Sequence, residues 1–140
     1  MNAKEYLAQA YRLDQRINSK LEQLEVMRSL TQRVTSTFGG EHVSHTRNVT
    51  SLQDSILRLM EAEEELNRDI DALVDLKMDI AANIAKVRND NERLLLEKRY
   101  LCFKTWEEIA VDMHYTTRWV RKVHDRALDV MEKILKEQCA

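Results

Sequence analysis

The sequence contains no proline and only two glycines, which are adjacent at Gly39 and Gly40. Proline breaks a helix and glycine weakens it, so their scarcity favours long helical runs. Aromatic residues make up only 6% of the chain, whereas charged residues make up 33% and apolar residues 44%. This composition is typical of helices with a solvated face, and its apolar share is too high for a disordered chain. We therefore expect an all-α protein.

Features that define several other classes of protein are missing. The two cysteines, Cys102 and Cys139, are too few and too far apart for a disulfide framework. No signal peptide pattern and no apolar run of membrane-spanning length occur in the sequence. We expect a reduced, cytoplasmic protein with no membrane partner. The net charge of −2 gives no overall attraction for nucleic acid, so any such site must be local.

Two long amphipathic helices are predicted, at residues 2–35 and from Thr50 to Val87, with a polar, turn-rich connection at 36–49. The apolar residues of the second helix recur at alternating steps of four and three, a heptad pattern typical of coiled coils. Glu63 and Lys77 are the polar interruptions of this series. The series consists of Leu52, Ile56, Leu59, Leu66, Ile70, Leu73, Ile80, Ile84 and Val87.

The first helix has a wider apolar face, which Asp14 and Arg28 interrupt. Two helices of similar length with a flexible joint predict a long antiparallel helical hairpin. Because a lone hairpin buries one stripe of each helix, we expect a homodimer that covers the remaining apolar surface. The apolar face consists of Leu7, Ala10, Ile17, Leu21 and Leu24, widened by Leu13, Met27, Leu30 and Val34.

The pattern changes at the polar cluster from Arg88 to Asn91, which is either a hinge or part of one continuous helix. We place a domain boundary there. Residues 1–88 form the hairpin, for oligomerisation or partner binding, and residues 89–140 form a tri-helical domain. Its helices are predicted at 91–102, 106–113 and about 117–136.

This C-terminal domain has the local signals of a helix-turn-helix. Thr105 and Glu108 match a capping box, in which each side chain bonds the other residue's amide. Ala110 supplies the small residue needed where the two helices cross. A tight turn follows at His114-Tyr115, and Thr116 is placed to cap the next helix.

The last predicted helix has one apolar and one basic face. Val120, Val123 and Ala127 are expected in the core. From Thr117 to Arg126 there are four lysine or arginine residues and one acid, Asp125. The first turn of this helix has no acid, although acid there would favour the helix dipole. This local basic excess is expected of a helix that enters a DNA groove. The expected DNA contacts are Thr116, Thr117, Arg118, Arg121 and Lys122, with Arg126 and Lys104 as phosphate contacts.

Three stretches of this domain, Leu95–Tyr100, Thr105–Ala110 and Thr116–Leu128, resemble region four of bacterial sigma factors. The chain is still more similar to small sigma-like regulators of phages and mobile elements. That group also carries a segment similar to residues 67–71 and the leucines that follow them. The resemblance implies that the helix-turn-helix reads a promoter element in the major groove of double-stranded DNA and touches RNA polymerase. His114 departs from the glycine common at its position, but histidine tolerates positive φ better than most residues.

By this resemblance, Thr117, Arg118, Arg121 and Lys122 lie where the family contacts bases or nearby phosphates. The sigma region that melts promoters has no counterpart in the sequence. We therefore expect a transcription regulator or a polymerase-recruiting adaptor. Two alternatives remain open: a DNA-packaging accessory protein like a small terminase subunit, and a protein-interaction module that does not bind DNA.

Nothing in the sequence predicts catalysis, a cofactor or a metal. Glu107 and Glu108 are adjacent on a helix, so they point in different directions and make a poor acid/base pair. His42 and His45 lack zinc-finger spacing, as do the residues scattered along the C-terminal part. Of the two tryptophans, Trp106 is expected to pack, while Trp119 neighbours the outward face. The scattered residues are Cys102, His114, His124 and Cys139.

Overall fold

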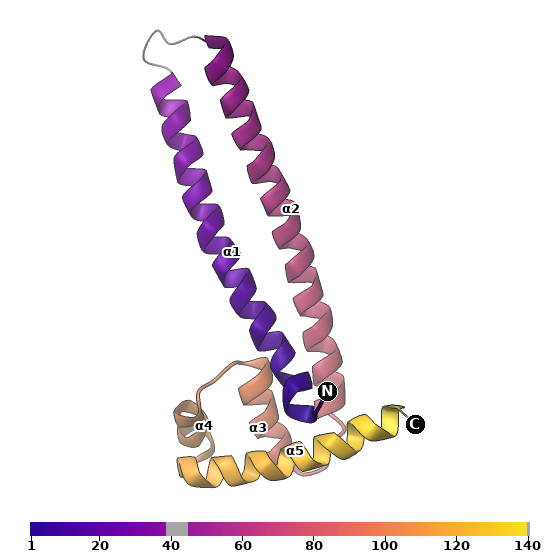
Figure 1. The fold of residues 1–140 in the computed structure, drawn as a ribbon. Coiled ribbons are helices and arrows are strands. Elements are labelled where there is room, and N and C mark those ends of the chain that lie inside the picture. The colour runs from indigo at the N-terminus through magenta and orange to yellow at the C-terminus, as the bar shows by residue number, and fades with distance from the viewer. Residues whose placement is uncertain (39–44, 140) are drawn as a thin grey trace. The chain divides into compact units, whose positions relative to one another are not determined.

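In a computed structural model, which describes residues 1–38 and 45–139, the described chain is helical with short connections and contains no strand. The predicted all-α class is confirmed. Side chains are described for residues 1–33 and 50–139. The elements are α1 (Ala3–Phe38), α2 (His45–Ile84), α3 (Asp90–Leu96), η1 (Glu97–Leu101), α4 (Trp106–Met113) and α5 (Thr117–Cys139). The α-helices are labelled in Figure 1.

The connection between the long helices is shorter than the predicted 36–49. Helix α1 continues to Phe38 and α2 already begins at His45, while 39–44 lie outside the described residues. Serine and threonine are poor helix formers but do not stop a helix, so the turn-rich composition made the predicted connection too long at both ends.

Helix α2 ends at Ile84 and not at the predicted Val87. The amides of Lys86 and Val87 bond the carbonyls of Asn83 and Ile84 at 3.1 and 2.9 Å, which closes a tight turn. Val87 is nevertheless buried, because it packs into a core from outside the helix. Val87 therefore fits the heptad pattern because it is buried, although it lies beyond the end of the helix.

The chain does not continue as one helix through the cluster from Arg88 to Asn91. Residues 87–89 are not helical, and Asn89 begins the next helix as its cap. Its side-chain oxygen accepts hydrogen bonds from the amides of Asn91 and Glu92, at 3.0 and 3.1 Å. A capping asparagine satisfies amides that have no partner within the helix, so a new helix starts here.

The helix predicted at 91–102 is two different elements. The chain is α-helical to Leu96 and then widens to a π-helical turn, in which the amide of Cys102 bonds the carbonyl of Glu97 at 3.1 Å. The wider turn carries an extra residue. It directs Tyr100 into the core, where the ring is buried. This tertiary contact explains the departure from a regular helix.

Packing divides the chain into two units. The C-terminal unit comprises residues 1–13 and everything from residue 73 onward, and the two-helix unit comprises residues 14–72. This division differs from the predicted one into 1–88 and 89–140. The first turns of α1 and the last turns of α2 belong with the short helices because they share a core with them.

The C-terminal unit contains two apolar cores. The first joins both long helices to α5 and to the end of α3, and its fully buried members include Leu7, Ile84, Leu96 and Met131. The second lies between α3, α4 and α5 (Figure 1). It consists of Leu95, Ile109, Ala110, Val120 and Val123, with Trp106, Met113 and Tyr115 packed against it.

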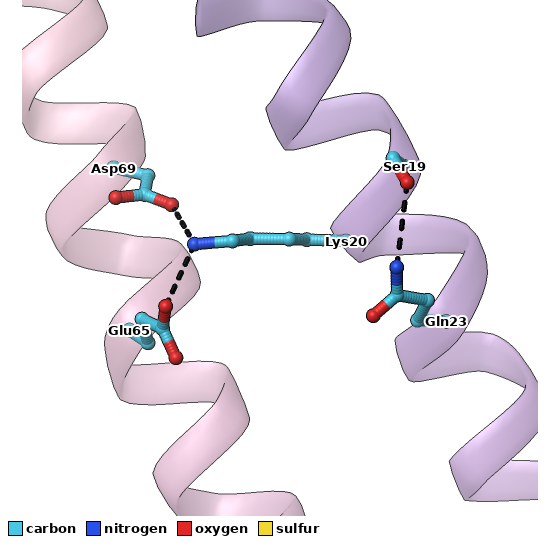
Figure 2. A network of polar contacts seen from close by, with 5 residues as sticks. All are labelled: Ser19, Lys20, Gln23, Glu65 and Asp69. Atoms are coloured by element: carbon cyan, nitrogen blue, oxygen red, sulfur yellow. Dashed lines mark hydrogen bonds and ion pairs between the residues drawn. The ribbon is translucent and has the colours of Figure 1, made fainter.

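In the two-helix unit, α1 and α2 run antiparallel. Figure 2 shows the ammonium group of Lys20 between the carboxylates of Glu65, at 2.8 Å, and Asp69. Further along α1, the guanidinium of Arg28 lies 3.0 Å from the carboxylate of Glu63, earlier in α2. Arg28 and Glu63 each interrupt the apolar series of their own helix, and they pair with each other across the two helices. Among the described side chains of this unit, the buried apolar residues are Ile17, Leu24 and Leu66.

Candidate nucleic-acid interface

A tight turn joins α4 to α5 at His114, whose φ of 58° and ψ of 40° lie in the left-handed region. Its amide bonds the carbonyl of Val111 at 3.3 Å, and the amide of Tyr115 bonds the carbonyl of Ala110 at 2.9 Å. These two bonds form a Schellman motif, which satisfies carbonyls at the end of a helix. The turn at His114-Tyr115 is as predicted, with histidine in the position that glycine often holds.

Both threonine caps predicted from the sequence are present. The hydroxyl oxygen of Thr105 accepts a hydrogen bond from the amide of Glu108, at 3.2 Å, and α4 begins there. The hydroxyl oxygen of Thr116 accepts one from the amide of Trp119, at 3.1 Å, and α5 begins at the next residue. The start of each helix is therefore fixed by its own local sequence.

The inner face of α5 fixes how this helix is rotated about its axis. Val120, Val123 and Ala127 are buried, as the sequence predicts. Val120 and Val123 pack with Ile109 and Ala110 of α4. Since these apolar residues face inward, Arg121, Lys122, Asp125 and Arg126 face solvent, while His124 shares the buried face.

The outer face of α5 is basic and exposed. It follows an N-terminal turn without an acid, whereas the first turn of α4 contains Glu107 and Glu108. Asp125 is the acid on this exposed stretch of α5. Six of the seven predicted DNA contacts are exposed together here, namely Thr116, Thr117, Arg118, Arg121, Lys122 and Arg126.

The seventh predicted contact, Lys104, has a different setting. Its ammonium group lies 2.5 Å from the carboxylate of Asp112, which also pairs with Lys98 at 3.3 Å. The hydrogen bond with Lys104 holds the pKa of Asp112 below its usual value, and the same bond raises the pKa of Lys104. Lys104 also lines a surface hollow with Glu107 and Glu108 of α4. Its charge is thus engaged in an acidic setting, apart from the basic face of α5.

The two tryptophans are used differently. Trp106 is half-buried, with the guanidinium of Arg99 4.3 Å from its ring centre and the imidazole of His124 at 4.6 Å, edge-on. It is a packing residue, as expected. Trp119 is 40% exposed on α5. The guanidinium of Arg126 lies 5.3 Å from its ring centre.

A buried polar pair that the sequence did not predict joins α5 to η1. The hydroxyl of Tyr100 lies 2.6 Å from Nε2 of His124. Burial lowers the pKa of His124 to about 4 and raises that of Tyr100 to about 12, so both are neutral near pH 7. The available signal was the helical spacing, since His124 follows Val120 by four residues and shares its buried face.

Other kinds of site find no support in the part of the chain that the structure describes. It holds no group of three or more histidine, cysteine or acidic side chains arranged to bind a metal. Among the same residues, no helix is both long and apolar enough to cross a membrane. Cys102 and Cys139 are free and exposed. The side chains of His42 and His45 lie outside the described residues.

Comparisons with known family models, with curated proteins and with solved structures found no match to this chain. An inference about its function therefore depends on the geometry of α4 and α5.

Proposed function

We propose that this protein is a sequence-specific, DNA-binding transcription regulator of the phage or mobile-element type. The observation that carries the proposal is the exposed basic face of α5, opposite a buried face that fixes its orientation. Helices α4 and α5 then act as a helix-turn-helix, with α5 as the recognition helix in the major groove. The N-terminal half of α5 faces the base edges, as is usual for this motif.

The chemistry of the exposed side chains suits both parts of DNA recognition. The guanidinium groups of Arg118 and Arg121 suit the two acceptors that guanine presents in the major groove. Lys122 and Arg126 suit phosphate oxygens, which position the protein without reading sequence. The amide end of α5 carries partial positive charge and no acid in its first turn, so phosphate is not repelled there.

The resemblance of this domain to sigma region four gives the proposal its biological setting. A domain of that kind places its recognition helix on promoter DNA beside RNA polymerase. RNA polymerase is therefore the protein partner that we propose for the C-terminal unit. Regulation in the cytoplasm, without enzymatic activity, follows from this setting.

The two-helix unit is proposed to form a coiled-coil hairpin that joins two copies of the chain. Only three apolar residues are buried among the described side chains of this unit, whereas seven large apolar ones remain exposed. A large exposed apolar surface marks an interaction site. The exposed residues are Leu21, Val26, Leu30, Ile56, Leu57, Met60 and Ile70.

Selection from a pool of random DNA duplexes tests the proposal. The purified protein is expected to enrich one motif, and two copies of this motif at a fixed spacing would report the dimer. The double variant Arg118→Ala/Arg121→Ala should enrich no motif, because it lacks both proposed guanine contacts. The matched control is Arg58→Ala/Arg68→Ala, which removes two exposed arginines from the two-helix unit and should select the same motif as the unaltered chain.

The other outcomes of this experiment point to other functions. If no duplex is enriched even at low salt, the DNA-reading proposal fails, and the exposed apolar surface of the two-helix unit indicates a protein-interaction module. Binding by a ring-sized oligomer would instead favour the DNA-packaging alternative, since a regulator of this kind is expected to be a dimer.

A further inference from the structure

Trp119 is unusual among the large apolar side chains of the C-terminal unit because it lies within the basic face of α5. It belongs to the first turn of the helix and is 40% exposed. Arg118 precedes it and Lys122 follows it by three residues, and both are exposed. An aromatic ring is thus presented to solvent between cations.

The ring of Trp119 is held in place by its neighbours. Tyr115 meets it edge-on, with 6.4 Å between ring centres. The guanidinium of Arg126, two helical turns further on, lies 5.3 Å from the ring centre. An ion above an aromatic ring is attracted by the ring's negative face. Because these contacts restrict the ring before any ligand arrives, a ligand that packs against it loses little conformational entropy.

We infer that Trp119 recognises thymine, through contact of its exposed ring with the C5 methyl group in the major groove. This inference rests on the proposed function and assigns a part of the sequence specificity to an apolar residue. The cations around the ring suit phosphates and acceptor atoms, whereas the thymine methyl is the apolar group that the major groove offers. Trp119 is therefore a specificity-determining residue, distinct from the guanine-reading arginines.

Replacement of thymine by uracil in the selected duplex tests this directly, because uracil lacks only the methyl group. At the contacted position, the unaltered protein should bind about fourfold more weakly, the effect of removing one methyl group from an apolar contact. In the variant Trp119→Ala, thymine and uracil should be bound equally. The control Val111→Ala truncates another exposed apolar residue, on α4, and should keep the fourfold preference.

Each result bears on the inference. Equal binding of thymine and uracil at every position of the selected site would overturn it, as would a selected site without thymine. A methyl preference that survives in Trp119→Ala would also overturn it. The uracil comparison with the unaltered protein stands even if that variant folds poorly, and Trp119→Gln then serves as a second variant. If the protein binds no DNA, the proposed function itself has failed, which is distinct from DNA binding without a methyl effect.

Discussion

At the scale of single residues, His114 shows how a local signal determines the turn. A residue with a β-carbon pays a steric cost in the left-handed region, and histidine, asparagine and aspartate bear it better than most. The structure gives His114 a φ of 58° and two hydrogen bonds around it that close the end of α4. This turn was predictable because the apolar pattern of the preceding helix ends just before it and the cap of the next helix, Thr116, lies just after it.

Substitution at His114 should therefore change stability according to the backbone. His114→Gly is expected to raise the free energy of unfolding by about 0.5–1 kcal/mol, because glycine avoids the steric cost of a β-carbon in this region and loses part of that gain to its greater freedom in the unfolded chain. His114→Val should lower it by about 1–2 kcal/mol, since a β-branched side chain is least tolerated there. Urea unfolding measures both. If valine were as stable as histidine, the left-handed turn would be absent in solution.

The burial of His124 could be predicted from its spacing to Val120, but its pairing with Tyr100 could not, because the two residues are 24 positions apart in the sequence. It is buried against Tyr100 and Trp106, and the charges of Asp125, Lys4 and Arg99 act on its pKa. Burial is the main cause of its lowered pKa, and the two cations lower it further while Asp125 opposes them. The folded protein therefore holds a neutral imidazole.

Acid should destabilise the protein through His124. The pKa falls from the ordinary 6.5 to about 4 on folding, so the unfolded chain binds more protons between these values. The contribution of His124 to stability is complete above pH 6.5 and is lost as the pH falls towards 4, by about 2 kcal/mol between pH 7 and pH 5. Urea unfolding of His124→Gln, which cannot titrate, should lack this loss.

His114, which is exposed, supplies the control for that experiment. His114→Asn removes an imidazole from the surface and keeps a residue that tolerates positive φ. It should retain the acid-induced loss of stability seen in the unaltered chain. The explanation fails if His124→Gln and His114→Asn show the same dependence on pH.

At the scale of elements, both ends of α4 and the start of α5 were the most predictable, while α5 runs to Cys139 and not to about residue 136. Trp106–Met113 is the predicted span of α4, and the predicted start of α5 at Thr117 is also correct. Each helix has a threonine cap just before it and a regular apolar spacing along it. These local signals were enough to predict the helices without knowledge of distant contacts. The π-helical turn at Glu97–Leu101 has no such local signature, and neither has the positive φ of 57° at Phe103. Both depend on packing. Tyr100 of the π-helical turn is buried, and the ring of Phe103 meets that of Tyr11 edge-on, with 5.5 Å between ring centres.

Different parts of α5 should contribute differently to DNA binding. Arg118→Ala is expected to cost about 1–3 kcal/mol on the selected site and to relax selection at one base position. Lys122→Ala should weaken binding to all sequences alike and reduce the slope of log affinity against log salt by about one. Fluorescence anisotropy titrations at several salt concentrations measure both quantities. Identical effects of the two variants would contradict the division into base and phosphate contacts.

At the scale of the whole molecule, the sequence predicted an all-α chain but placed its internal division elsewhere. The ends of α1 and α2 share a core with α5, and Leu7, Ile84 and Met131 meet there. Hydrophobic periodicity shows which face of a helix is buried, but it does not show which partner covers that face. The heptad series therefore runs across residue 73 with no change in the sequence that marks the division between the two-helix unit and the C-terminal unit.

Self-association should depend on the two-helix unit. Leu57→Glu/Met60→Glu places charge on the exposed apolar surface of α2 and is expected to convert the dimer to a monomer, because buried charge without a partner is costly. The control Val111→Glu changes an exposed apolar residue of the C-terminal unit, which is 74% accessible, and should leave the dimer intact. Sedimentation equilibrium distinguishes the species. A monomeric unaltered chain would refute the proposed homodimer.

The measurement that tests the central claim most directly is the affinity of the protein for its selected duplex and for a shuffled duplex of the same composition, over a range of salt. We expect much tighter binding to the selected duplex, a difference that is lost in Arg118→Ala/Arg121→Ala and kept in Arg58→Ala/Arg68→Ala. Equal affinity for the two duplexes at every salt concentration, or a preference that survives the loss of Arg118 and Arg121, would contradict recognition of DNA by α5.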